Sequence, residues 1–191
     1  MRPSSFALAL AVLTSGCALT QKSAPTPLRF FTLERVDAPA GKPAAAAPIR
    51  VRLGRVTSSE NLRKRIVFRR DAQELGEYES LRWTENPEEY VRRRIARALF
   101  EQRPVAPPEG KRDPVLDVEL TGCEEVRRGA ERAGRVVVIA QLSDPSGAVI
   151  FRRTFAAITP APGGGIAAVV GALDTSLDEV VERIVTTLPQ P

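Results

Sequence analysis

Cys17 is the side chain whose surroundings in the sequence point most directly to chemistry. It follows three small residues, 14–16, and these follow an unbroken apolar run over Phe6–Leu13 with Arg2 near its start. The run is shorter than the roughly 20 apolar residues that span a bilayer, so residues 1–16 are predicted to be a cleaved signal peptide. A thiolate directly after the cleavage site can carry a diacylglyceryl group, and the new N-terminal amine can then be acylated.

The stretch Leu13–Cys17 resembles a bacterial lipobox, although Thr14 stands at the position where leucine is commonest. An ordinary signal peptide with an incidental cysteine is the alternative interpretation. Three acyl chains, at about 0.8 kcal/mol for each buried CH₂, would exceed the two signals that a stable anchor requires. Ala18 and Leu19 follow the cysteine, where an aspartate would favour retention at the inner membrane. We therefore expect a lipid anchor at Cys17 in the outer membrane, on its periplasmic face.

Other chemistry finds little support in the sequence. The chain contains no histidine, which removes the commonest general base and the commonest metal ligand. Cys123 has no intramolecular disulfide partner once Cys17 is acylated, and the acids beside it would raise its pKa. The adjacent pairs Glu88–Glu89 and Glu124–Glu125 point apart on a helix or a strand and are interpreted as solvated surface. We therefore expect no catalytic site, no metal and no cofactor apart from the lipid on Cys17.

The charge of the chain is mildly positive. The 191 residues have a formal net charge of +5 but no basic patch interleaved with aromatic residues, so a nucleic-acid partner is not expected. The basic runs Arg63–Arg65 and Arg92–Arg94 could contact anionic lipid head groups or an acidic partner, but a solvated face is the favoured interpretation. The loop Pro162–Gly165 lacks the Lys-Ser/Thr of a phosphate-binding loop and is interpreted as the entry to a helix.

The rest of the chain suits one folded domain over residues 29–188, joined to the anchor by a polar, proline-bearing tether over residues 17–28. An Ala/Pro-rich stretch over 37–48 is interpreted as an exposed linker. Gly54 interrupts an alternating apolar pattern and suggests a β-bulge. Apolar patterning predicts strands at 29–33, 49–53, 66–68, 75–83, 116–120, 135–142 and 149–158.

Two helices are predicted. Asn86, Pro87 and Glu89 have the types and spacing of a capping box, and helical spacing of apolar residues continues until Pro104. A second helix is predicted over residues 166–188, where apolar residues recur in alternating steps of four and three. The order of these elements predicts an α+β fold, in which a mostly antiparallel sheet has two helices packed on one face.

The segment before the first predicted helix resembles a known family. Arg69 follows an apolar strand, and Tyr78 and Trp83 precede the helix. Together with the lipobox, the early Phe-Thr-Leu segment at 31–33 and the long C-terminal helix, this order resembles the ABC-type transport auxiliary lipoprotein family, the group that contains the paraquat-inducible lipoprotein PqiC. The Ala/Pro-rich insert and the proline-rich loop at 104–114 depart from the family pattern.

The resemblance implies a non-catalytic accessory role in lipid transport between the inner and outer membranes. Such lipoproteins resemble partners of MCE-domain proteins, which bridge the periplasm and are served by an ABC permease and ATPase. On this hypothesis Cys17 anchors the chain and the folded domain docks the MCE-domain protein. Arg69, Tyr78 and Trp83 match the family pattern and are the candidate partner-binding residues, although core packing is the favoured role for Trp83.

Two other functions stay open at this point. The chain could be a lipoprotein cofactor of another envelope machine, such as a peptidoglycan synthase, although the tether is short for reaching the cell wall. It could also be a lipid-binding carrier with its own acyl-chain cavity. Association into a homo-oligomer is compatible with each of these functions.

Overall fold

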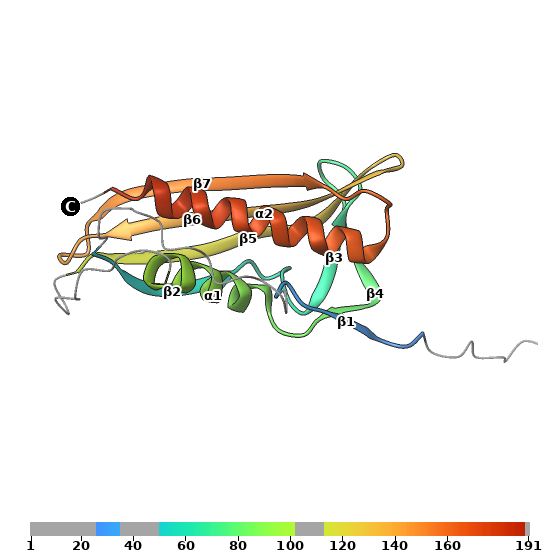
Figure 1. The fold of residues 1–191 in the computed structure, drawn as a ribbon, viewed down its shortest axis with the longest axis horizontal. Coiled ribbons are helices and arrows are strands. Elements are labelled where there is room, and N and C mark those ends of the chain that lie inside the picture. Colours follow the sequence, from blue (N-terminus) through green and yellow to red (C-terminus); the bar gives the residue numbers. More distant parts are fainter. Residues whose placement is uncertain (1–25, 35–49, 102–112, 190–191) are drawn as a thin grey trace, which may run out of the picture.

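The computed structural model describes residues 26–34, 50–101 and 113–189 of the chain (Figure 1). Cys17, the Ala/Pro-rich linker and most of the proline-rich loop lie outside these residues. The strands are β1 (Arg29–Phe31), β2 (Arg52–Ser58), β3 (Arg65–Arg69), β4 (Leu75–Trp83), β5 (Val115–Arg128), β6 (Glu131–Ser143) and β7 (Val149–Pro160). The helices are α1 (Pro87–Phe100) and α2 (Ile166–Thr187). No helix within the described ranges is long and apolar enough to cross a bilayer.

All the described strands form one mixed sheet. Its order is β1-β4-β3-β5-β6-β7, with β2 beside β5. The long strands β5, β6 and β7 are antiparallel neighbours, and β3 is antiparallel to β4. In contrast, β2 and β3 both run parallel to β5, and β1 runs parallel to β4. Most paired residues are therefore in antiparallel ladders, and the predicted α+β fold is confirmed.

Strand β5 joins the two parts of the sheet. Its first half pairs with β2 and its second half with β3, so two separate strands share one of its edges. A register shift between Leu120 and Gly122 in the ladder with β6 separates the two halves. Because the shift adds a residue, side chains after it change sides relative to a regular strand. Glu125 consequently lies opposite Gly134 of β6, on the face that α2 covers.

Both helices lie on the same face of the sheet, as predicted (Figure 1). Helix α2 crosses β6 and β7, whereas α1 lies over β2. The two helices are joined by Arg94, whose guanidinium binds the carboxylates of Asp174 and Asp178 and donates to the carbonyl of Leu33 at 2.7 Å. The prediction that the run Arg92–Arg94 faces solvent is therefore wrong for Arg94, because position 94 lies on the side of α1 that meets α2.

Local predictions agree with the structure to different degrees. The register shift between Leu53 and Val56 confirms the bulge expected at Gly54. The strand around it begins later than predicted, at Arg52, and continues to Ser58. Asn86 occupies the N-cap position of α1, but its side chain makes no capping hydrogen bond, so the capping box is wrong.

Gly134 allows β6 and α2 to approach closely. A Cβ atom at this position would lie 2.4 Å from the backbone nitrogen of Leu173 and 2.7 Å from the carbonyl carbon of Ala172. Backbone atoms of a packed helix cannot move aside as a flexible side chain can. The hydroxyl of Ser176 also donates to the carbonyl of Gly134 at 3.0 Å, which fixes the same contact.

We expect Gly134→Ala to lower the free energy of unfolding by about 1–3 kcal/mol, because it forces α2 away from the sheet. Gly171→Ala is the matched control, since a Cβ there meets open space on the exposed side of α2. That substitution should raise the free energy of unfolding by about 0.5–1 kcal/mol through helix propensity. Urea unfolding followed by Trp83 fluorescence measures both values, and equal effects would contradict this packing.

Candidate functional site

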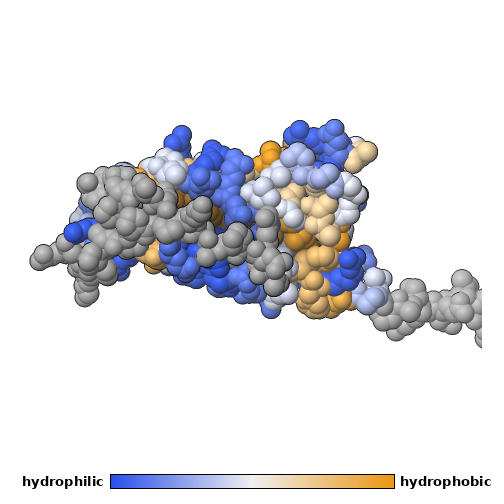
Figure 2. Space-filling model, viewed as in Figure 1, coloured by the Kyte–Doolittle hydropathy of each residue, from blue (hydrophilic) through white to orange (hydrophobic). Residues whose placement is uncertain are grey.

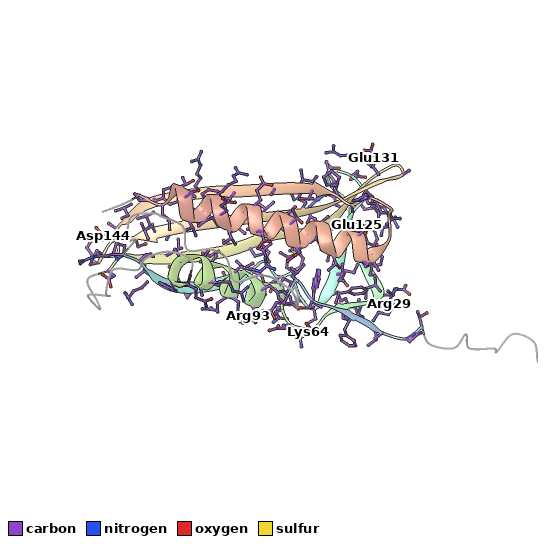
Figure 3. The ribbon with its side chains drawn as sticks, viewed as in Figure 1. Arg29, Lys64, Arg93, Glu125, Glu131 and Asp144 are labelled. Atoms are coloured by element: carbon purple, nitrogen blue, oxygen red, sulfur yellow. The ribbon has the colours of Figure 1, made fainter. Side chains whose placement is uncertain are left out.

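Glu124 and Glu125 form a buried carboxylate pair in the second half of β5. Their relative exposures are 1% and 0%. The prediction that this pair is solvated surface is therefore wrong. The two side chains do point to opposite faces, but arginines from neighbouring strands cover both of them. Figure 3 places Glu125 near the end of the sheet where β5 turns into β6, with Glu131 at the turn.

Glu124 lies on the face of the sheet away from the helices, between two guanidinium groups. Its Oε1 accepts hydrogen bonds from Arg69 Nε of β3 and Arg135 Nη1 of β6, both at 2.7 Å. Arg69 also donates from Nη1 to the carbonyl of Ala72 at 3.0 Å, which ties the turn after β3 to the same side chain. Glu124 therefore joins β3, β5 and β6 through charged hydrogen bonds.

Glu125 lies on the helix-covered face and has three donors. Its Oε2 accepts a hydrogen bond of 2.5 Å from the hydroxyl of Tyr78 and one of 3.1 Å from Arg127 Nη2. Arg132 Nη1 donates to its Oε1. Burial alone would raise the pKa of Glu125, but the hydrogen bonds from Arg127, Tyr78 and Arg132 outweigh it and lower the pKa below the usual value. Glu125 therefore stays ionised at neutral pH.

Aromatic rings complete the surroundings of Glu125. The guanidinium of Arg127 lies 3.7 Å from the centre of the Phe68 ring and 5.1 Å from that of the Tyr78 ring. The two rings meet edge to face with centres 5.3 Å apart. Gly76 leaves room for this arrangement, since a Cβ there would lie 2.4 Å from the Phe68 ring. Burial, and then the hydrogen bond and charge of Glu125, raise the pKa of Tyr78, so it remains a neutral donor.

The structure brings together two of the candidate residues that the sequence indicated. Arg69 and Tyr78 bind adjacent carboxylates, one from each face of the sheet. Trp83 lies elsewhere, buried in the core with its ring centre 6.2 Å from that of Tyr90 in α1. Cys17 lies outside the described residues. Sequence reasoning missed the carboxylate pair itself, although pairing the hairpin 115–143 in register would have placed Glu124 opposite Arg135.

Cys123 is buried directly before the carboxylate pair. Burial, with a further contribution from the charge of Glu124, raises the pKa of the Cys123 thiol to about 12. This confirms the expectation of a raised pKa, and at neutral pH the group is an unreactive thiol. Within the described ranges, no three acidic, cysteine or histidine side chains come together in a way that could hold a metal ion.

An open groove with a volume of about 680 Å³ lies beside the pair, where the β5–β6 turn meets the end of β7 and the loop before α2. Its lining includes the apolar side chains of Val126, Ile158 and Ala161, the cationic side chains of Arg128 and Arg132, and the acidic side chain of Glu131. Arg132 lines the groove and also binds Glu125, so the buried carboxylate pair positions one wall of the groove. A groove of this composition can hold a molecule with an apolar body and a negative end.

Comparison with known families identifies the group to which this scaffold is related. The family model of the ABC-type transport auxiliary lipoprotein component matches residues 31–185, from the end of β1 to the last turn of α2. The chain belongs to this family. It is therefore an auxiliary lipoprotein component of an ABC-type transport system, and a membrane-anchored protein of the cell envelope.

Solved structures share the fold of this lipoprotein at low sequence identity. Protein XCC0632 from Xanthomonas campestris is 18% identical with a TM-score of 0.67, and the match covers 82% of this chain and 92% of that protein. An uncharacterized protein is 15% identical with a TM-score of 0.64, over 84% of this chain and 98% of its own length. Comparison with curated proteins gave no match.

We expect Glu125→Gln to lower the free energy of unfolding by about 3 kcal/mol, because Arg127 and Arg132 would lose their buried counter-charge. The control is Glu131→Gln, which removes an exposed carboxylate at the adjacent turn. That variant should unfold at nearly the wild-type urea concentration. If the two variants lose the same stability, the burial of charge at Glu125 does not stabilise this end of the sheet.

The stabilisation from Glu125 should also depend on pH. Since folding lowers the pKa of Glu125 from its usual 4.5, its contribution is fully present above that value and is lost as the pH falls through the folded pKa. The difference in unfolding free energy between wild type and Glu125→Gln should thus stay constant around neutral pH and shrink in acid. A difference that grows on acidification would contradict this assignment. Urea unfolding of wild type and Glu125→Gln at several pH values measures this difference in unfolding free energy.

Proposed function

We propose that this lipoprotein is an outer-membrane-anchored, non-catalytic docking component of an MCE-type ABC transport system that moves lipids between the inner and outer membranes. The family match over residues 31–185 is the observation that carries the proposal. Within it, residues 1–16 are the signal peptide, 17–28 the lipidated tether and 29–188 the domain that binds the partner. Cys17 carries the diacylglyceryl and acyl groups, and the MCE-domain protein with its permease and ATPase is the partner.

The chemistry of the described domain supports docking as the mode of action. The carboxylates of Glu124 and Glu125 are fully engaged with arginines and a tyrosine, so their role is to hold neighbouring strands together. The thiol of Cys123 is buried and protonated. In this proposal Arg69 and Tyr78 support partner binding indirectly, because they fix the positions of β3 and β4 in the domain that binds the partner. Trp83, the last residue of β4, acts in the same way through its packing in the core.

A second candidate function is a lipid-binding carrier, and the groove beside the β5–β6 turn is the observation that favours it. The groove combines apolar side chains with Arg128 and Arg132. Native mass spectrometry of the purified mature protein would distinguish the functions. Retention of a phospholipid favours the carrier, and a ligand-free mass favours docking alone.

We expect the lipidated protein, tagged at its C-terminus and extracted in mild detergent from its own bacterium, to co-purify with an MCE-domain protein and an ABC permease. Cys17→Ser should recover less of both, because the chain is no longer held at the membrane surface. Quantitative mass spectrometry of the two eluates makes the comparison. Recovery of a peptidoglycan synthase, or of no transport component, would contradict the proposed partner.

We expect sucrose-gradient fractionation to place the wild-type protein in the outer membrane. Ala18→Asp should shift it to the inner-membrane fraction, because aspartate after the lipidated cysteine favours retention there. Cys17→Ser should appear in the soluble periplasmic fraction when the cells are fractionated in high salt, since about 0.8 kcal/mol for each buried CH₂ is then lost. Immunoblots of the fractions measure these distributions. Wild-type protein at the inner membrane would contradict the proposed location.

A further inference from the structure

We propose that the surface around β1 rests on the anionic phospholipid head groups of the membrane that holds the anchor. This surface consists of Leu28, Phe30, the loop Arg63–Lys64, Arg65 and Arg82, and it is called the β1 surface below. The inference rests on the proposed anchor at Cys17. It adds a second, non-covalent contact with the bilayer, which would fix the orientation of the domain.

Leu28 and Phe30 expose apolar side chains where the tether meets the domain. Their relative exposures are 54% and 58%, and Phe30 is the most exposed large apolar side chain in the described part of the chain. Figure 2 shows hydrophobic residues gathered towards the end of the molecule where β1 lies and α2 begins. Two large apolar side chains in water next to a lipid tether are suited to insertion among head groups.

The sheet register determines which way Phe30 points. Phe31 pairs with Trp83, which lies in the core beneath α1. Because neighbouring residues of a strand point to opposite faces, Phe30 points away from the helices. It pairs with Arg82 of β4, which in turn pairs with Arg65 of β3. One aromatic and two cationic side chains therefore form a row across three strands on the helix-free face.

Cationic side chains lie around this row. The carbonyl of Lys64 accepts a hydrogen bond of 2.6 Å from the Trp83 amide, and the carbonyl of Phe31 accepts one of 2.9 Å from the Thr84 amide. These bonds hold the loop Arg63–Lys64 and β1 against the same end of β4. Figure 3 shows Lys64 on the side of the molecule where β1 lies. Arg29 alternates to the other face of β1, where its guanidinium lies 5.2 Å from the centre of the Phe31 ring.

Three acids near the β1 surface bind arginines, whereas Glu79 of β4 is exposed and forms no ion pair within the described chain. Arg65 binds Glu77 at 2.9 Å. The carboxylates of Glu34 and Glu85 both bind Arg93 of α1. Arg82 donates to the carbonyls of Tyr78 and Leu81, and these bonds leave its positive charge in place. The surface therefore keeps an excess of positive charge beside its exposed apolar side chains.

The short tether indicates that the membrane is the binding partner of the β1 surface. The eleven residues from Ala18 to Leu28 span at most about 36 Å when fully extended. The β1 surface begins where this tether ends, so it is the part of the domain that the anchor keeps nearest to the bilayer. Clustered Lys and Arg beside a lipid anchor attract anionic head groups, and Phe and Leu add apolar burial at the interface.

Vesicle flotation with the unlipidated mature chain, residues 17–191 carrying Cys17→Ser, tests the inference. We expect it to float with vesicles of phosphatidylethanolamine and phosphatidylglycerol, and not with vesicles of phosphatidylcholine alone. The double variant Leu28→Ser/Phe30→Ser should bind about tenfold more weakly, because the inserted apolar side chains are lost. Arg63→Gln/Lys64→Gln should weaken binding to the anionic vesicles and reduce its dependence on salt.

The control variant is Val149→Ser/Ile150→Ser. It removes two apolar side chains of similar exposure, 54% and 51%, from β7, which is not paired with β1 or β4. It should bind vesicles as the parent chain does, and circular dichroism confirms that every variant is folded. Equal loss in both serine double variants, or no flotation of the parent chain, would overturn the inference. The inference would also be overturned if Leu28→Ser/Phe30→Ser bound vesicles as the parent chain does but had a lower molar mass by light scattering. The β1 surface would then contact a second copy of the chain.

This assay contains no transport partner and no lipid anchor. Failure to float would therefore overturn the contact of the β1 surface alone. The co-purification and fractionation experiments test the proposed function separately.

Discussion

Two neighbouring carboxylates in the second half of β5 set the main physical constraint on this protein. Glu124 and Glu125 are both buried, and an ionised carboxylate without partners would be very costly there. Arg69, Arg132 and Arg135 come from strands on either side of β5, and Tyr78 comes from β4. Satisfying the pair therefore requires β3, β4 and β6 to be correctly placed around β5 at the same time. The pair thereby helps to specify the register of β3 against β5, which share only three paired positions.

This constraint connects the core to the proposed function through β1. Among the described strands, β1 pairs only with β4, and β4 joins the rest of the sheet through β3. The short strands β1, β3 and β4 are therefore held to the long hairpins mainly at the second half of β5, where the carboxylate pair lies. Arg94 provides a second link, because it joins α1, α2 and the segment after β1. The end of the domain that carries the tether is thus fixed relative to the helices by charged groups.

Local patterns in the sequence predicted most of the elements, because each depends on nearby residues. The range of β4, the bulge at Gly54 and the face of α2 follow from alternation or helical spacing. Contacts between distant residues could not be predicted in this way. A Glu-Glu pair is typical of surface, and its burial depends on a β-bulge and on arginines from two other strands. The parallel pairing of both β2 and β3 with one edge of β5 likewise depends on tertiary packing. Family resemblance indicated Arg69 and Tyr78 without revealing what they bind.

Hydrogen–deuterium exchange of Glu124→Gln against wild type tests most directly whether the carboxylate pair holds the short strands on the sheet. The structure predicts faster exchange for amides of β3 and β4, with little change in β6, β7 and α2, because only the link to Arg69 and Arg135 is weakened. Glu119→Gln, an exposed substitution on the same strand, should leave the pattern unchanged. Unaltered exchange in β3 and β4, or uniform acceleration over the whole domain, would contradict this account.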